Sequence, residues 1–131
     1  MRNVITFGSF DVFHVGHLRL LQRASTLGDK LFVGVSTDQL HRHKKSRDAI
    51  YSFQDRVDIL TGLSCVSKCF AEESLKLKRT YITKYQANIL VMGDDWMGAF
   101  DNCSDLCRVV YLERTPSIST SKIIEVINSP S

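Results

Sequence analysis

Short apolar runs alternate with amphipathic helical patterns along most of the 131 residues. In the helical patterns the apolar positions recur every three or four residues. They predict helices at Gly16–Leu27, Phe53–Leu63, Leu75–Tyr85 and Ser119–Ile127. The apolar runs between them predict five strands: Val4–Phe7, Lys30–Ser36, Cys65–Phe70, Ile89–Met92 and Val109–Leu112. This alternation indicates an α/β fold in which a doubly wound parallel sheet of about five strands forms one domain, residues 1–131.

The polar motifs of the chain follow the ends of predicted strands. This holds for a turn containing His14 and His17, a basic segment after the second strand, Gly93-Asp94-Asp95-Trp96, and the loop Arg114–Thr120. In doubly wound sheets ligands bind beyond the carboxyl ends of the strands. The sequence therefore predicts that all four motifs share one rim of the sheet.

The turn Gly8-Ser9-Phe10-Asp11 leads through His14-Val15-Gly16-His17 into the first predicted helix. A helix start offers free N–H groups and a positive dipole end, which suits a phosphate. Two imidazoles three residues apart share one face of the first turn. Ordinary half-buried histidines and a metal pair are the alternatives, and the joint match of spacing and context favours a functional role. Ser9 fits phosphate binding and simple turn chemistry equally, and Asp11 fits loop orientation or a magnesium-bound phosphate.

A basic cluster, Lys44, Lys45 and Arg47, is predicted to lie on a flexible loop. On this rim it is expected to close over phosphorylated ligands, although the spacing does not say which lysine makes the contact. Arg56 is a cation in the first turn of a predicted helix, where the dipole prefers anions. This mismatch suggests that Arg56 serves a phosphate or a subunit contact.

Two further segments are candidates for binding a nucleotide. Gly93 and Asp94 follow a buried strand, where an aspartate can bind a base, orient a partner or approach a metal. The second segment precedes the last helix and offers hydroxyl and N–H groups at a helix start, with a cation nearby; its residues are Arg114, Thr115, Ile118, Ser119 and Thr120.

Together these motifs resemble the HxGH nucleotidyltransferase superfamily, and within it the glycerol-3-phosphate cytidylyltransferase family. The matching segments are Val4–Asp11, His14–His17, Ser36–Asp38, Lys44–Arg47, Val91–Trp96, Val109–Leu112 and Arg114–Thr120. The R-T-x-x-I-S-T element is characteristic of the cytidylyl branch.

The resemblance implies an enzyme that transfers CMP from CTP to a small phosphorylated acceptor, releasing pyrophosphate. Glycerol 3-phosphate is the expected acceptor, which would give CDP-glycerol for cell-surface polysaccharide synthesis. The alternative acceptors are another polyol phosphate, an amino-alcohol or amide phosphate, and a phosphonate. The alternative function is a non-catalytic nucleotide-binding module.

The resemblance also assigns site residues. His14 and His17 stabilise the transition state, with Lys44 or Lys45 contacting the phosphates of both substrates. The acceptor is expected near Asp38, Lys44 and Arg56. Magnesium or another divalent ion accompanies CTP, carried mainly by the triphosphate, and the protein is expected to be a homodimer. The nucleotide site comprises Gly8, Ser9, Phe10, Asp11, His14, His17, Gly93, Asp94, Arg114, Thr115, Ile118, Ser119 and Thr120.

Composition adds few constraints. A net charge of +3 is too small to indicate a nucleic-acid or membrane partner. The start leads directly into a strand, so we expect no signal peptide and a cytoplasmic location. Four cysteines, Cys65, Cys69, Cys103 and Cys107, form two C-x3-C pairs. We expect reduced structural thiols, with a zinc site as the lesser alternative.

The chain departs from the family pattern at two segments. One is the loop around Lys44, whose length and composition differ near the expected entry of the acceptor, so the identity of the acceptor stays open. Ser64-Cys65-Val66-Ser67 stands where the family tends to have Arg-Tyr-Val-Asp. The missing arginine and aspartate put dimer coupling and acceptor contacts in question.

Overall fold

A computed structural model describes residues 1–116 and 118–129. Ser117, inside the loop predicted at Arg114–Thr120, lies outside the described residues, as do Pro130 and Ser131. Five parallel strands form one sheet in the order β3-β2-β1-β4-β5. Their bounds are β1 Asn3–Gly8, β2 Lys30–Ser36, β3 Lys68–Glu72, β4 Ile89–Gly93 and β5 Arg108–Leu112. The predicted fold class is confirmed.

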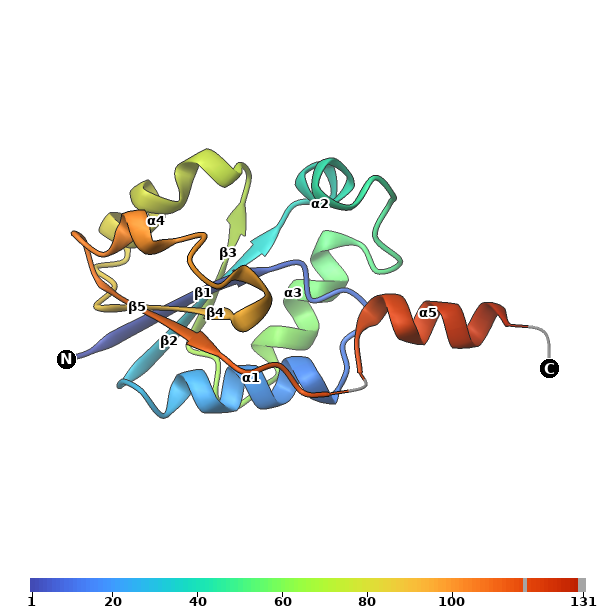
Figure 1. Cartoon of the computed structure of the whole chain (residues 1–131), viewed down its shortest axis with the longest axis horizontal. Coiled ribbons are helices and arrows are strands. Elements are labelled where there is room, and N and C mark those ends of the chain that lie inside the picture. Colours follow the sequence, from blue (N-terminus) through green and yellow to red (C-terminus); the bar gives the residue numbers. More distant parts are fainter. Residues whose placement is uncertain (117, 130–131) are drawn as a thin grey trace.

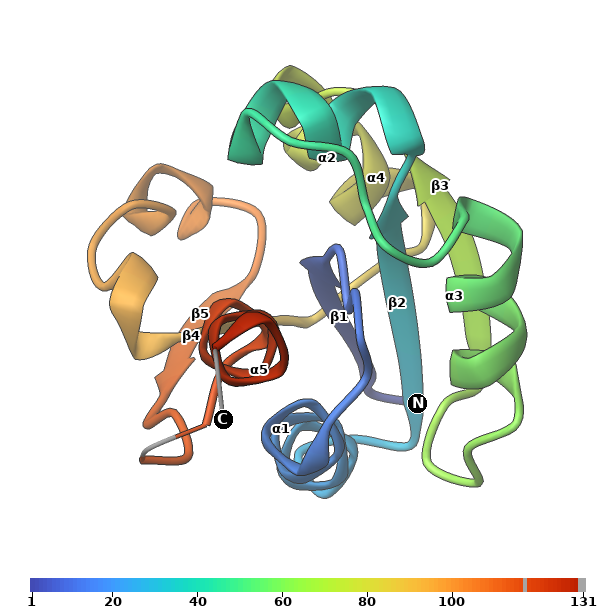
Figure 2. The ribbon, with the colours of Figure 1, turned by 90° about the vertical axis from the view of Figure 1, so that its right-hand side faces the viewer.

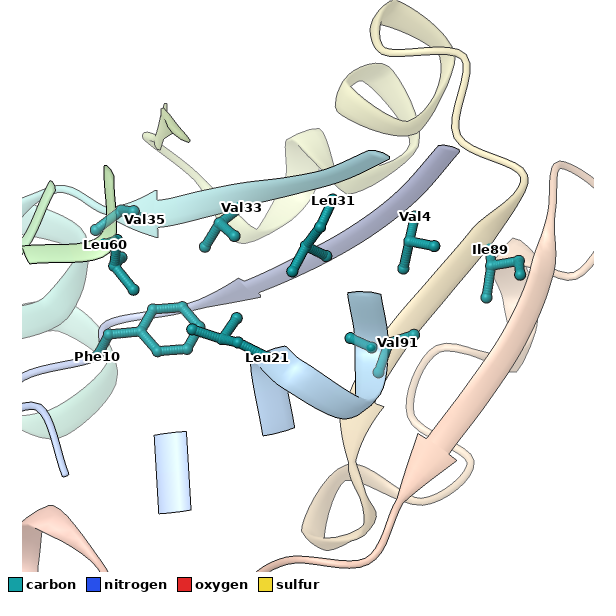
Figure 3. Packing of buried hydrophobic residues seen from close by; sticks show 10 residues of the cluster. Val4, Phe10, Leu21, Leu31, Val33, Val35, Leu60, Ile89 and Val91 are labelled. Carbon is teal, nitrogen blue, oxygen red and sulfur yellow. The ribbon is translucent and has the colours of Figure 1, made fainter. Parts of the chain in front are cut away.

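Helices cover both faces of the sheet (Figure 1). Side chains alternate between the faces of a strand, so Val4 of β1 packs in the cluster under α1 and α3, whereas Ile5 packs on the opposite side. Figure 3 shows the first cluster, where Leu21 of α1 and Leu60 of α3 meet the strand residues. The second cluster includes Ile82 of α4. The bounds of the helices are α1 Val15–Ser25, α2 Asp38–Lys45, α3 Phe53–Thr61, α4 Lys78–Lys84 and α5 Thr120–Asn128, with 3-10 turns η1 Leu75–Leu77, η2 Asp94–Trp96 and η3 Asp101–Cys103.

The basic segment is a helix and not the loop that the sequence analysis expected. Thr37 caps α2, because its hydroxyl accepts a hydrogen bond from the N–H of Leu40 at 3.2 Å. The helix ends at Ser46, whose backbone is left-handed with φ of 58°. The dense like charges in this segment disfavour a helix locally, but the Thr37 cap and the packing of Leu40 and His41 stabilise it, and the helix fixes where each lysine points.

Other element boundaries differ in detail. The third strand begins at Lys68, so Cys65 precedes it, and the segment predicted as one helix at Leu75–Tyr85 opens with the 3-10 turn η1. Ser52 and Ser119 cap α3 and α5. All four cysteines are free thiols, and burial raises the pKa of each.

Candidate active site

The polar motifs meet at the carboxyl rim of the sheet, which faces the viewer in Figure 2. Helices α1 and α2 lie on opposite sides of the end of β1 in both views (Figures 1 and 2). Helix α5 begins at this rim and projects beyond it (Figure 1). The rim therefore brings together segments from the first and last parts of the chain.

The two histidines of the first turn cap α1 and stack on each other. Their ring centroids lie 3.8 Å apart with an interplanar angle of 20°. Nδ1 of His14 accepts a hydrogen bond from the N–H of Gly16 at 3.0 Å, and Nδ1 of His17 accepts from the N–H of His14 at 3.2 Å. A neutral imidazole that accepts at one nitrogen carries its proton on the other. The backbone thus assigns both rings the tautomer with a hydrogen on Nε2.

Burial keeps these rings neutral. Phe10 and Phe13 each lie 5.4 Å from the ring of His17, centroid to centroid. Burial, followed by the neighbouring His14, lowers the pKa of His17 to about 3, against an opposing effect of Asp11. Burial and then the guanidinium of Arg114 also lower the pKa of His14. Near neutral pH His17 is therefore a hydrogen-bond donor and not an acid or a base.

The turn before the histidines is strained. Phe10 and Val12 have φ of 55° and 48°. A positive φ is uncommon for any residue other than glycine, and for the β-branched Val12 it is an outlier. The carboxylate of Asp11 accepts hydrogen bonds from the N–H groups of Ile50 and Tyr51 at 2.8 and 2.9 Å. Of the two roles considered for Asp11, the structure shows loop orientation.

The segment before α5 docks directly on this turn. The hydroxyl of Thr120 donates to the carbonyl of Asp11 at 2.6 Å. A Cβ on Gly16 would lie 2.8 Å from Cε1 of His14 and 3.2 Å from Cγ2 of Ile118. The close approach of these groups explains the need for glycine between the histidines.

A groove of about 560 Å³ lies between η2 and the start of α5. This volume is in the range of small-molecule sites. Asp94 accepts a hydrogen bond from the N–H of Arg114 at 3.4 Å across it. Thr115 lies in an adjoining hollow beside α1. Gly93 is the last residue of β4 and directly precedes η2. The residues that line the groove are Asp94, Glu113, Arg114, Pro116, Ile118, Ser119 and Lys122.

Helix α2 distinguishes its two lysines. Lys45 is exposed, whereas Lys44 is partly buried and donates to the hydroxyl of Ser36 at 2.7 Å, at the carboxyl end of β2. Burial lowers the pKa of Lys44 to about 8. The carboxylate of Glu72 opposes this shift, and the positive charge of Lys78 adds to it. Lys44 therefore points at the rim, and Lys45 points to solvent.

Arg56 is fully buried and forms all its hydrogen bonds with protein groups. It donates to the carbonyls of Ser9 at 2.9 Å and Ser36 at 2.7 Å, which are at the ends of β1 and β2. It also pairs with the carboxylate of Asp38 at 2.8 Å, whose side chain is 58% exposed. In this structure Arg56 holds the rim in shape, and of the pair only Asp38 is exposed to a ligand.

Three buried polar residues at the rim were missed from the sequence. His41 of α2 lies 2.8 Å from the hydroxyl of Ser9, measured from Nδ1 to Oγ. Glu72 ends β3 and pairs with Lys78 at 2.6 Å. Glu72 is followed by Glu73 and Ser74, and His41 and Lys78 lie among other charged residues, so no local signal in the sequence distinguished any of the three.

Comparison with known proteins decides the family. The sequence profile described as Cytidylyltransferase-like matches residues 5–126. The chain belongs to the cytidylyltransferase-like family. The matched residues include the histidine turn, the residues that line the groove, and the basic helix α2.

Relatives of this cytidylyltransferase-like chain include two named glycerol-3-phosphate cytidylyltransferase. The one from Bacillus subtilis is 44% identical over 127 residues, covering 97% of this chain and 98% of the relative. The one from Staphylococcus aureus is 41% identical, covering 94% and 92%. An FAD synthase from Thermococcus kodakarensis is 28% identical over 95% of this chain and 90% of its own length.

A solved structure supports the fold alone. The lipopolysaccharide core biosynthesis protein from Thermoplasma volcanium superposes with a TM-score of 0.79 at 21% identity, covering 88% of this chain and 98% of that one. Among the described residues, the helices are all too short or too polar to cross a membrane.

The family departure at Ser64–Ser67 lies away from the rim. The hydroxyl of Ser67 accepts a hydrogen bond from the N–H of Leu31 at 3.1 Å, at the amino-terminal ends of β2 and β3. The site is at the other end of these strands, so the replaced positions have no direct contact with it in this structure.

Proposed function

We propose that the protein is a CTP-dependent glycerol-3-phosphate cytidylyltransferase. It transfers CMP from CTP to glycerol 3-phosphate and releases CDP-glycerol and pyrophosphate. The observation that carries the reaction type is the stacked pair of neutral imidazoles, whose two Nε2–H groups stand at a helix N-terminus on the ligand-binding rim. The names of the relatives that match nearly the whole chain support the choice of acceptor.

Neutral imidazoles suit this chemistry. An oxygen of the acceptor phosphate attacks the α-phosphorus of CTP, and the bond from that phosphorus to the bridging oxygen breaks. Its electron pair leaves with pyrophosphate. The attacking oxygen is already ionised, so no general base is required, and donors that stabilise charge on the phosphoryl oxygens contribute most. His14 and His17 supply such donors without taking a proton.

CTP is placed with its phosphates against the histidine turn and its base in the groove. Backbone groups of the groove are fixed by the Asp94–Arg114 hydrogen bond and by the Ser119 cap. The side chain of Arg114 lies close enough to lower the pKa of His14, so it is available to a phosphate or a base carbonyl. Asp11 and Thr120 hold the turn in shape through their hydrogen bonds.

The acceptor is placed beside α2. Lys44 provides the cation for its phosphate, and the free carboxylate oxygen of Asp38 can accept from a hydroxyl of the glycerol. The buried pair Glu72–Lys78 interacts with the charge on Lys44 and bounds this side. Such a site suits a small polyol phosphate.

A divalent ion fits this arrangement as a companion of the triphosphate. In residues 1–116 and 118–129 no group of three His, Cys, Asp or Glu side chains is suited to hold a metal. Asp11 is already bonded to two N–H groups. Magnesium would neutralise the phosphates of CTP and the leaving pyrophosphate, while Lys44 and Arg114 provide the protein's positive charge. A homodimer, a cytoplasmic location and a role in cell-surface polymer synthesis remain part of this proposal.

An acceptor panel tests the proposal. Pyrophosphate release is measured with CTP or ATP and with glycerol 3-phosphate, ribitol 5-phosphate, phosphocholine, phosphoethanolamine or a phosphonate. We expect the highest kcat/KM with CTP and glycerol 3-phosphate. Better turnover with ATP would refute the cytidylyl assignment, and better turnover with another acceptor would replace glycerol 3-phosphate. CTP binding without turnover on any acceptor would favour a non-catalytic nucleotide-binding module.

A further inference from the structure

His41 occupies a position that packing alone does not explain. It lies on α2 and is 1% exposed. Nδ1 is within 2.8 Å of the hydroxyl of Ser9, while Nε2 is buried with no hydrogen-bond partner among the described residues. An unpaired buried polar atom is destabilising. A leucine there would avoid this cost, so the contact with Ser9 is the feature of the imidazole that packing does not supply.

Ser9 is held from two sides. Its carbonyl accepts from Arg56 at 2.9 Å, and its hydroxyl pairs with His41. The first contact fixes the backbone of the turn that leads to the histidines, and the second fixes the rotamer of the hydroxyl. With the ring proton on Nδ1, His41 donates to the Ser9 oxygen, which leaves the Ser9 hydroxyl proton free to donate to a phosphate.

His41 also links this turn to the lysine of α2. His41 and Lys44 are three residues apart on one face of the helix, so a displacement of α2 moves both side chains. Lys44 reaches the end of β2 at Ser36, and His41 reaches the end of β1 at Ser9. Burial lowers the pKa of His41. The carboxylate of Asp11 opposes this shift, and the positive charges of Arg56, Lys44 and Arg47 add to it. The ring is therefore uncharged near neutral pH and does not repel these cations.

We propose that His41 is a positioning residue that fixes the Ser9 hydroxyl toward the phosphates of CTP. It also keeps that hydroxyl at a constant position relative to Lys44. This inference rests on the proposed function, because the phosphates are those of the nucleotide. His41 itself does not touch the substrate.

The experiment is a double-mutant cycle at Ser9 and His41, with kcat and KM for CTP measured for each variant. His41→Leu should lower kcat/KM for CTP by about fivefold to tenfold, the range of one hydrogen bond, without lowering Tm. In the Ser9→Ala background the same change should cost less than about twofold, because the partner is gone. His41→Asn, which keeps a polar atom near the position of Nδ1, should recover most of the loss. His43→Leu, at an exposed residue of the same helix, is the matched control and should have no effect.

Any of three results would overturn the proposal. They are additive effects of the two substitutions, unchanged kinetics in His41→Leu, and equal losses in His41→Asn and His41→Leu. A second readout does not need turnover: Ser9→Ala should shift the Nδ1 nitrogen resonance of His41, and His41→Leu should weaken CTP binding. If wild-type protein transfers no CMP, the proposed function fails, while the resonance and the CTP affinity still test the role of His41. An unshifted resonance, or unchanged CTP affinity in His41→Leu, would overturn it.

Discussion

The two halves of the rim are built differently. On the nucleotide side, the histidine turn is held mainly by backbone groups: cap hydrogen bonds fix the rings, and Thr120 ties the turn to α5. On the acceptor side, the site is held by buried or partly buried side chains: Arg56, Lys44 and the Glu72–Lys78 pair. The orientation of the two rings is therefore set by local sequence spacing. The contacts of Arg56 with Ser9 and Ser36 instead join segments far apart in the chain, as does the tie of Thr120 to Asp11.

This difference predicts where substitutions act on chemistry. His17→Ala should lower the rate of CMP transfer by at least about a hundredfold, comparable to the loss of one transition-state donor. CTP affinity should change much less, because the groove and the basic residues remain. Steady-state pyrophosphate release and calorimetric CTP binding measure the two quantities.

His43→Ala, exposed on α2, is the control and should leave both quantities unchanged. A loss of less than tenfold in His17→Ala would show that the imidazole pair is not the centre of the reaction.

On the acceptor side, the matched pair Lys44→Ala and Lys45→Ala tests which lysine faces the ligand. Loss of a charge-assisted hydrogen bond costs about 1.5–3 kcal/mol, so Lys44→Ala should lower kcat/KM for the acceptor by more than about tenfold. Lys45→Ala should lower it by less than about threefold, as for an exposed charge. Equal losses would contradict the orientation that α2 gives these lysines.

The pH dependence sharpens the same point. The pKa of Lys44 is lowered to about 8, so the free enzyme holds this charge below that pH and loses it as pH rises through about 8. The kcat/KM for the acceptor should fall over this range. In Lys44→Arg the fall should move to higher pH, because a guanidinium stays charged. An unchanged profile in Lys44→Arg would assign the fall to another group.

Gly16→Ala is expected to have the smallest effect. In an ordinary helix position alanine is about 0.5–1 kcal/mol more favourable than glycine. Here the new Cβ would contact the ring of His14 and Ile118, so we expect destabilisation of about 1 kcal/mol, typical of overpacking. Urea denaturation measures it, and a stabilised variant would show that the I-S-T segment does not pack on the turn.

The same contrast explains what the sequence could predict. The fold, the shared rim, and the location of His14, His17, Asp94 and Arg114 follow from strand pattern and motif spacing, and the structure agrees with them. The orientation of Lys44 did not follow, because it depends on a helix, capped by Thr37, whose run of like charges is also typical of a loop.

Long-range contacts account for the other differences. Arg56 was expected to serve a phosphate or a subunit contact, yet its partners Ser9 and Ser36 become neighbours only when β1 and β2 pair. His41 is likewise defined by its contact with Ser9, 32 positions earlier. No local pattern specifies such pairs.

The central claim is that the paired imidazoles bind the phosphates of CTP while cytosine lies near α5. A crystal structure of the protein with CTP tests it most directly. The account predicts phosphate oxygens within hydrogen-bond distance of Nε2 of both His14 and His17, with the base in the groove beside Asp94 and Arg114. A nucleotide bound elsewhere, with both rings far from any phosphate, would contradict it.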